Sequence, residues 1–196
     1  MLFRSGLLQP PATQTVLFTG GTVWTSAGAG IVSPGAVLIE NGRVAYVGPA
    51  NNPALVVPPG AMKVDCTGKH ITPGLIDCHS HTGISRGVNE SGEAVTAEVR
   101  VRDVVNPDDV NWYRELAGGV TTVNQLHGSA NAIGGQSCTT KLRWGAVSPD
   151  DMVMQTQVDG IKFALGENPR GANGFRESTR YPQTRMGVEA LIRDRF

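Results

Sequence analysis

Two histidines separated by one residue, His79 and His81, are the side chains in this sequence best suited to chemistry. They end a mostly apolar stretch, residues 71–81, whose composition is typical of a β-strand. Because side chains alternate between the two faces of a strand, both imidazoles and the carboxylate of Asp77 point to the same side. The spacing therefore predicts a divalent-metal site at the end of this strand. Asp77 either supports an imidazole through a hydrogen bond or caps the strand end.

Lys162 is a second candidate metal ligand. It lies in a predicted strand, residues 161–165, where alternation places it on one face with the small residues Ala164 and Gly166. Small neighbours leave space around the amine, although a solvated surface lysine is the competing interpretation. Glu167, which follows this strand, is an alternative metal carboxylate in place of Lys162.

The two remaining histidines are weaker candidates. His127 follows a predicted strand, residues 120–126, so it either faces the substrate or belongs to a loop. His70 lies outside the spaced pair and is expected to be structural or exposed.

The first third of the chain is predicted to form strands. Residues 36–40 and 43–47 are mostly apolar and are joined by Asn41-Gly42, which favours a two-residue type I′ hairpin turn. The other strands predicted here are short: residues 16–18, residues 22–24 after a break at Gly20-Gly21, and residues 62–64. Together they predict a small sheet module with no obvious chemistry of its own.

A helix is predicted between the strand that carries the histidines and the strand at residues 120–126. Asn106 can cap its N-terminus, Pro107 suits its first turn and Gly118 ends it. Its apolar face is expected to contain Val110, Tyr113, Leu116 and Ala117. The order strand, helix, strand predicts parallel pairing of the two strands, and the polar segment 82–106 is expected to line an active site.

The remaining segments are less informative. Residues 128–136 are rich in glycine but lack the lysine and the spacing of a phosphate loop. A third strand is predicted at residues 139–144. A helix is predicted over residues 184–196, with Val188, Leu191, Ile192 and Phe196 on one side.

Composition excludes several classes of protein. The chain carries 17 basic and 17 acidic side chains, and this balance argues against a nucleic-acid or an anionic-membrane partner. No apolar run approaches the ~20 residues that span a bilayer. Residues 1–14 have a short apolar core stopped by Pro10 and Pro11, so they make a poor signal peptide and a cytoplasmic location is expected. The three cysteines have neither disulfide nor zinc spacing and are expected to be reduced thiols.

Several blocks of sequence together resemble the amidohydrolase superfamily. They are AVLIENGRVAYVG at residues 36–48, ITPGLIDCHSH at 71–81, GGVTT at 118–122, IGGQ at 133–136 and GIKFALGENP at 160–169. An isolated His-x-His pair carries little information, but after Pro-Gly-Leu-Ile-Asp and a β-rich segment it becomes specific.

The resemblance implies an α/β fold, namely the N-terminal part of a (β/α)8 TIM-like barrel preceded by a small β-sandwich module. Residues 1–68 are expected to form the module, in incomplete form, and residues 69–196 about the first four β/α units of a truncated barrel. Because a barrel of eight units needs roughly 200–400 residues, the sequence is expected to be part of a longer protein.

The implied function is hydrolysis of a carbon–nitrogen bond in a small non-peptide amide or cyclic amide, through water activated by a divalent metal ion. One or two ions, with zinc as the expected metal, would bind His79 and His81, and a two-ion site would also use Lys162 as a carbamate. The expected partner is a small-molecule substrate, and assembly into a homo-oligomer is an alternative that the sequence leaves undecided. Two hypotheses of other classes remain: a non-catalytic fragment, and a β-rich binding module in which the His pair is incidental.

Overall fold

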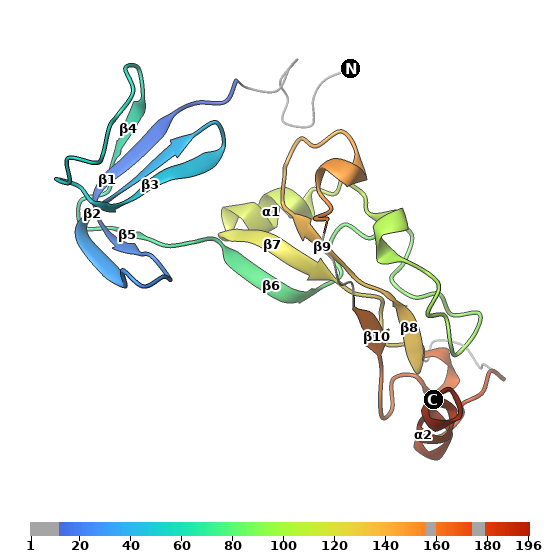
Figure 1. The fold of residues 1–196 in the computed structure, drawn as a ribbon. Coiled ribbons are helices and arrows are strands. Elements are labelled where there is room, and N and C mark those ends of the chain that lie inside the picture. Colours follow the sequence, from blue (N-terminus) through green and yellow to red (C-terminus); the bar gives the residue numbers. More distant parts are fainter. Residues whose placement is uncertain (1–11, 156–159, 174–178) are drawn as a thin grey trace. The chain divides into compact units, whose positions relative to one another are not determined.

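The computed structural model describes residues 12–155, 160–173 and 179–196 (Figure 1). The segment considered above as a signal peptide lies mostly outside these residues. The chain divides into two compact units between Gly74 and Leu75. None of the helices in the described ranges is long and apolar enough to cross a membrane.

The first unit is a five-stranded sheet built around one long strand, β1 (Val16–Trp24). β1 pairs antiparallel with β2 (Ile31–Glu40), which pairs antiparallel with β3 (Arg43–Pro49). On its other side β1 pairs in parallel with β4 (Met62–Asp65) and with β5 (His70–Ile71). The sequence around β1 thus forms one sheet in which β1 has partners on both edges.

Two predictions about this sheet have different outcomes. Asn41 and Gly42 have φ angles of 50° and 71°, the left-handed values that a type I′ turn requires, so the predicted hairpin is confirmed. The prediction of two short strands broken at Gly20-Gly21 is wrong, because β1 continues through these residues with register shifts between Thr19 and Val23. Such a bulge absorbs an extra residue while the strand stays paired with β2.

The hydrophobic core of the first unit lies on one face of the sheet. Leu17, Ala36 and Leu38 are buried there. The loop after β3 and the end of β3 itself pack against them through partly buried residues: Tyr46, Ala50, Leu55 and Val57. This burial fixes which face of β1 and β2 turns inward.

The second unit begins with the strand that carries the histidines. β6 (Leu75–Ser80) pairs in parallel with β7 (Val120–Gln125), and α1 (Asn111–Ala117) lies between them in sequence. The parallel pairing predicted for these two strands is confirmed. β9 (Cys138–Lys141) then pairs antiparallel with β7, so the order in the sheet is β6-β7-β9.

Shorter elements complete the second unit. β8 (Ile133–Gln136) and β10 (Ile161–Phe163) form a separate antiparallel pair. α2 (Arg185–Asp194) is the longest helix of the described residues, and Thr184 caps it by accepting a hydrogen bond from the N–H of Gly187. Within the described residues, three 3-10 helices lie in the loops: η1 (Val101–Val104), η2 (Pro149–Asp151) and η3 (Arg170–Asn173).

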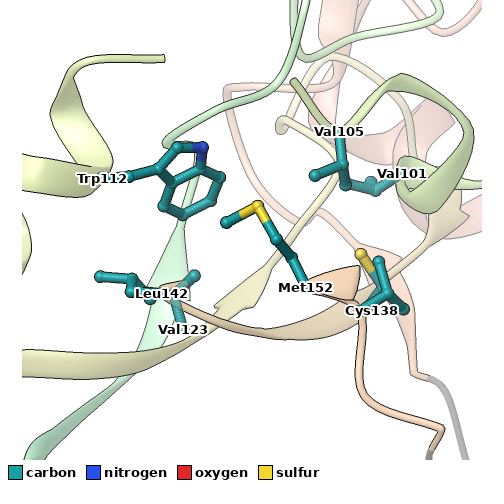
Figure 2. Packing of buried hydrophobic residues seen from close by; sticks show 8 residues of the cluster. Val101, Val105, Trp112, Val123, Cys138, Leu142 and Met152 are labelled. Atoms are coloured by element: carbon teal, nitrogen blue, oxygen red, sulfur yellow. The ribbon is translucent and has the colours of Figure 1, made fainter. Parts of the chain in front are cut away.

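The core of the second unit is built around Trp112, whose side chain is fully buried on α1 (Figure 2). Its buried partners come from η1 and its C-cap, β7, β9 and the segments after β9: Val101, Val105, Val123, Cys138, Leu142, Met152 and Val153. The indole N–H donates to the carbonyl oxygen of Asn106 at 2.8 Å. The core therefore also anchors the end of the long segment that follows β6.

The predicted boundaries and faces of both helices need correction. α1 begins at Asn111 rather than at residue 107, and the predicted face residues Val110 and Tyr113 are 48% and 56% exposed. The larger indole of Trp112 takes the buried position instead. Gly118 ends the helix as predicted. In α2, Val188 and Leu191 are buried, but Phe196 lies beyond the last helical residue and is 92% exposed.

Candidate functional site

His79 and His81 lie at the carboxyl end of β6. His79 is inside the strand, and His81 directly follows its last residue, Ser80. Both side chains are exposed. Their ring centroids are 5.4 Å apart and their planes are nearly perpendicular, at 89°. The strand thus brings the two imidazoles together.

The orientation of His81 is set by the neighbouring strand. Its Nδ1 lies 2.8 Å from the carbonyl oxygen of Leu126, the residue that follows β7. Since a carbonyl oxygen only accepts hydrogen bonds, Nδ1 of the neutral ring carries the proton and Nε2 keeps its lone pair. Metal-bound imidazoles commonly donate their other N–H to a carbonyl or carboxylate in this way. On this observation His81 fits a metal ligand that binds through Nε2.

Asp77 makes a hydrogen bond to the main chain of its own strand. Its Oδ1 accepts a hydrogen bond from the main-chain N–H of His79 at 3.0 Å. The carboxylate is half-buried and belongs to the same strand. Asp77 therefore holds the backbone at the strand end, which is the capping alternative.

His127 is buried in the loop that follows β7, with 3% of its surface exposed. Its Nε2 accepts a hydrogen bond from the N–H of Glu90 at 2.8 Å, and its Nδ1 donates to the carbonyl oxygen of Gly128 at 3.0 Å. Burial lowers the pKa of His127 below its ordinary value of 6.5, and this effect outweighs the hydrogen bond to Gly128 and the charge of Glu90, which raise it. The ring is therefore neutral, and both nitrogens are used within the chain.

Lys162 lies on β10, and the exposure of its neighbours follows the predicted alternation. Lys162 is partly buried and Ala164 is buried, whereas Ile161 and Phe163 are 45% and 41% exposed. The charge of Lys162 is close enough to influence His127. The observed exposure thus agrees with the alternation predicted for this strand.

The other two candidate side chains are engaged elsewhere. Glu167 pairs with Arg185 at 3.0 Å and with Arg170, and these hydrogen bonds lower the pKa of its carboxyl group. His70 belongs to the first unit, where its Nδ1 accepts a hydrogen bond from the indole N–H of Trp24 at 2.9 Å. His70 is exposed, as expected for a residue outside the spaced pair.

Within residues 12–155, 160–173 and 179–196, no three side chains of His, Cys, Asp or Glu gather into a group that could hold a metal ion.

Sequence reasoning missed a buried polar network that begins next to His81. Gln125, at the end of β7, is fully buried, and its Nε2 donates to the carbonyl oxygen of Thr82 at 2.6 Å. The hydroxyl of Thr82 donates to the carboxylate of Glu115 on α1. Strand alternation could have indicated that Gln125 is buried, because it lies two residues after the buried Val123 and so points to the same face of the strand.

Comparison with known proteins adds a family to this geometry. No protein-family model matches the chain. The chain is 34% identical over 178 residues to the amidohydrolase tasK of Hapsidospora irregularis, a match that covers 83% of this chain and 18% of that protein. It is 49% identical over 55 residues to the imidazolonepropionase of Mesorhizobium japonicum, or 28% of this chain and 13% of that protein.

A solved structure is similar over most of the chain. The amidohydrolase from Thermotoga maritima gives a TM-score of 0.73 with 38% sequence identity, covering 91% of this chain and 46% of that one. The chain thus spans less than half the length of each of these three proteins.

The mixed α/β arrangement of the chain matches that of the Thermotoga maritima amidohydrolase. The chain belongs to the amidohydrolase superfamily, and the match covers part of the length of its relatives.

Proposed function

We propose that this chain supplies the first two metal ligands, His79 and His81, of an enzyme that hydrolyses a carbon–nitrogen bond in a small non-peptide amide or cyclic amide. The observation that carries the proposal is the hydrogen bond from Nδ1 of His81 to the carbonyl oxygen of Leu126, beside the ring of His79. It leaves Nε2 of His81 free to bind a cation. The relatives named amidohydrolase and imidazolonepropionase support the choice of a carbon–nitrogen bond.

We further propose that β6, α1 and β7 are the first β/α repeat of a (β/α)8 TIM-like barrel. The compact unit that contains β1 to β5 is proposed to contribute to a β-sandwich. The parallel pairing of β6 and β7 supports the barrel. So does the position of the histidines at the carboxyl end of β6, because active sites of such barrels lie at that end. The likeness to the Thermotoga maritima amidohydrolase extends over both units.

When bound, a divalent ion such as zinc lowers the pKa of a coordinated water toward about 7 and polarises the scissile carbonyl group. The contribution of the chain is orientation. The carbonyl of Leu126 fixes the tautomer of His81, and Asp77 holds the backbone at His79. Both imidazoles are exposed, so a small substrate can reach the space in front of them.

Lys162 is proposed as a ligand of a second ion after reaction with CO2. The ammonium group first gives one proton to solvent. The neutral amine then attacks the carbon of CO2, a nitrogen–carbon bond forms while one carbon–oxygen π bond breaks, and the nitrogen gives a second proton to solvent. The +1 ammonium group thereby becomes a −1 carbamate that two cations can share. The partly buried position of Lys162, on the same face of the strand as the buried Ala164, supports this assignment.

The test of the proposed function is zinc binding by single-residue variants. His79→Ala and His81→Ala should each reduce the zinc bound per chain, measured by mass spectrometry after equilibrium dialysis. His70→Ala, which removes an exposed imidazole from the first unit, is the matched control and should bind as much zinc as the parent. Circular dichroism checks that each variant keeps its secondary structure. Equal zinc content in all four proteins would disprove the role of the pair.

A further inference from the structure

His127 connects two loops that follow neighbouring strands. Through Nε2 it accepts the N–H of Glu90, in the segment after β6, and through Nδ1 it donates to Gly128, in the segment after β7. This hydrogen bond is partly buried, so loss of the acceptor would leave the N–H of Glu90 without its partner in the chain. The ring is therefore a specific tie between the two segments.

The surroundings of the ring leave it little freedom. A Cβ added at Gly134 would lie 2.7 Å from Nδ1 of His127, and one added at Gly135 would lie 3.2 Å from its Cδ2. The glycines of the sequence IGGQ therefore let β8 pass directly against the imidazole. The ring and the segment that it holds also line a pocket of about 270 Å³, formed by residues 84–90, residues 99–101 and residue 104.

The position of His127 in the chain links this tie to His81. His127 directly follows Leu126, whose carbonyl oxygen accepts the hydrogen bond from Nδ1 of His81. The N–H of Leu126 donates to the carbonyl oxygen of Ser80 at 3.0 Å. The peptide before Leu126 is thus fixed by β6, and the peptide after it, which carries the carbonyl, is fixed by the anchored ring of His127.

We propose that His127 is a positioning residue for His81: by holding Glu90 and Gly128, it aims the Leu126 carbonyl at Nδ1 and so keeps Nε2 of His81 directed at the metal. This inference rests on the proposed function, in which His81 binds the ion. Loss of groups that orient a metal-bound imidazole lowers metal affinity by about 10–100-fold.

Two substitutions of His127 distinguish the effect of its hydrogen-bond acceptor, Nε2, from the effect of the volume of its ring. The side-chain amide of His127→Gln reaches the position of Nε2, so its oxygen can accept from Glu90. The amide of His127→Asn reaches only the position of Nδ1 and keeps the donor to Gly128. The variants are compared in the 196-residue chain by zinc titration and by hydrogen exchange of the Glu90 amide, with His70→Asn as control and His81→Ala as the reference for loss of the ligand.

We expect His127→Asn to speed exchange at Glu90 about tenfold and to weaken zinc binding about tenfold, while His127→Gln stays within about threefold of the parent in both. Faster exchange at Glu90 with unchanged zinc affinity in His127→Asn would overturn the inference and leave the proposed function standing. Equal losses in both variants would show that ring volume matters rather than the acceptor, which also overturns it. Unchanged zinc affinity in His81→Ala would overturn the proposed function itself, and the inference with it.

Discussion

The protonation of individual imidazoles decides what this chain can do. His81 carries its proton on Nδ1 and presents Nε2, His70 accepts on Nδ1 from Trp24, and His127 uses both nitrogens. The sequence alone predicts that His79 and His81 lie together, because strand periodicity is local. It does not predict the tautomers, because the partner carbonyls and N–H groups come from residues that are distant in sequence.

A first prediction at this scale concerns Lys162. If it carries CO2 and binds a second ion, Lys162→Ala should halve the metal content of a protein that holds two ions, and a short carboxylic acid such as propionate should partly restore it. Lys141→Ala, which removes an exposed lysine from β9, is the control. Metal content measured with and without propionate gives the answer. A variant with the stoichiometry of the parent would rule out the carbamate.

A second prediction concerns the pH dependence of stability. Because burial lowers the pKa of His127 below 6.5, the unfolded chain takes up a proton at this residue at a pH where the folded chain does not. The stability that comes from the neutral ring is therefore fully present above pH 6.5 and is lost as the pH falls below it. Urea denaturation between about pH 5 and 8 should show this loss. His127→Gln should have a flatter profile, and an identical slope in both proteins would contradict the assignment.

At the scale of elements, local patterns predicted pairing and alternation better than boundaries. Asn41-Gly42 defines its hairpin because both residues tolerate positive φ, and the alternation around Lys162 survives because one face of β10 is covered. The predicted start and apolar face of α1 were wrong, because they depend on the burial of Trp112 among partners from β7 and β9. The antiparallel return of β9 along β7 was not predicted either. It depends on how the glycine-rich segment 128–137 reverses the chain.

The prediction that belongs to α1 compares two adjacent aromatic residues. Trp112→Ala should lower the free energy of unfolding by about 3–5 kcal/mol, because it leaves a cavity in the core and removes the hydrogen bond to Asn106. Tyr113→Ala should cost less than about 1 kcal/mol, because that side chain is 56% exposed and packs mainly on Trp144. Urea denaturation measures both. Similar losses for the two variants would mean that the core is not centred on Trp112.

At the scale of the whole molecule, the described chain is two units, and its buried apolar residues form one cluster in the first unit and two in the second. The parallel pairing of β6 and β7 could be predicted from the order strand, helix, strand, whereas the fold class was implied by the resemblance. The division at Gly74 could not, because residues 71–81 look continuous in sequence although β5 pairs with β1 and β6 pairs with β7. The partner of each strand depends on which apolar residues are buried before and after Gly74.

The prediction at this scale concerns self-association through β6. β6 lies at the edge of its sheet, and its residues Leu75 and Ile76 are 60% and 73% exposed. Exposed apolar edge strands favour pairing between chains. Ile76→Lys should therefore shift the chain toward monomer in sedimentation velocity at tens of micromolar, whereas Met186→Lys, at a site on α2 that is 78% exposed, should not. A parent chain that is monomeric at the same concentration would contradict this.

The partners of β1 lie at very different distances along the sequence, and these distances predict the order in which the strands of the first unit pair during folding. Trp24 pairs with Ile31 nearby, whereas Val16 pairs with Met62 far along the chain. A hairpin with a short loop forms in about 1–10 μs, while contacts between distant residues must first overcome the entropy of closing a long loop. We therefore expect β2 and β3 to pair first, β1 to join them next, and β4 and β5 to pair with β1 last. The docking of β4 on β1 then limits the folding rate of the unit, and a faster turn at Asn41-Gly42 would leave that rate nearly unchanged.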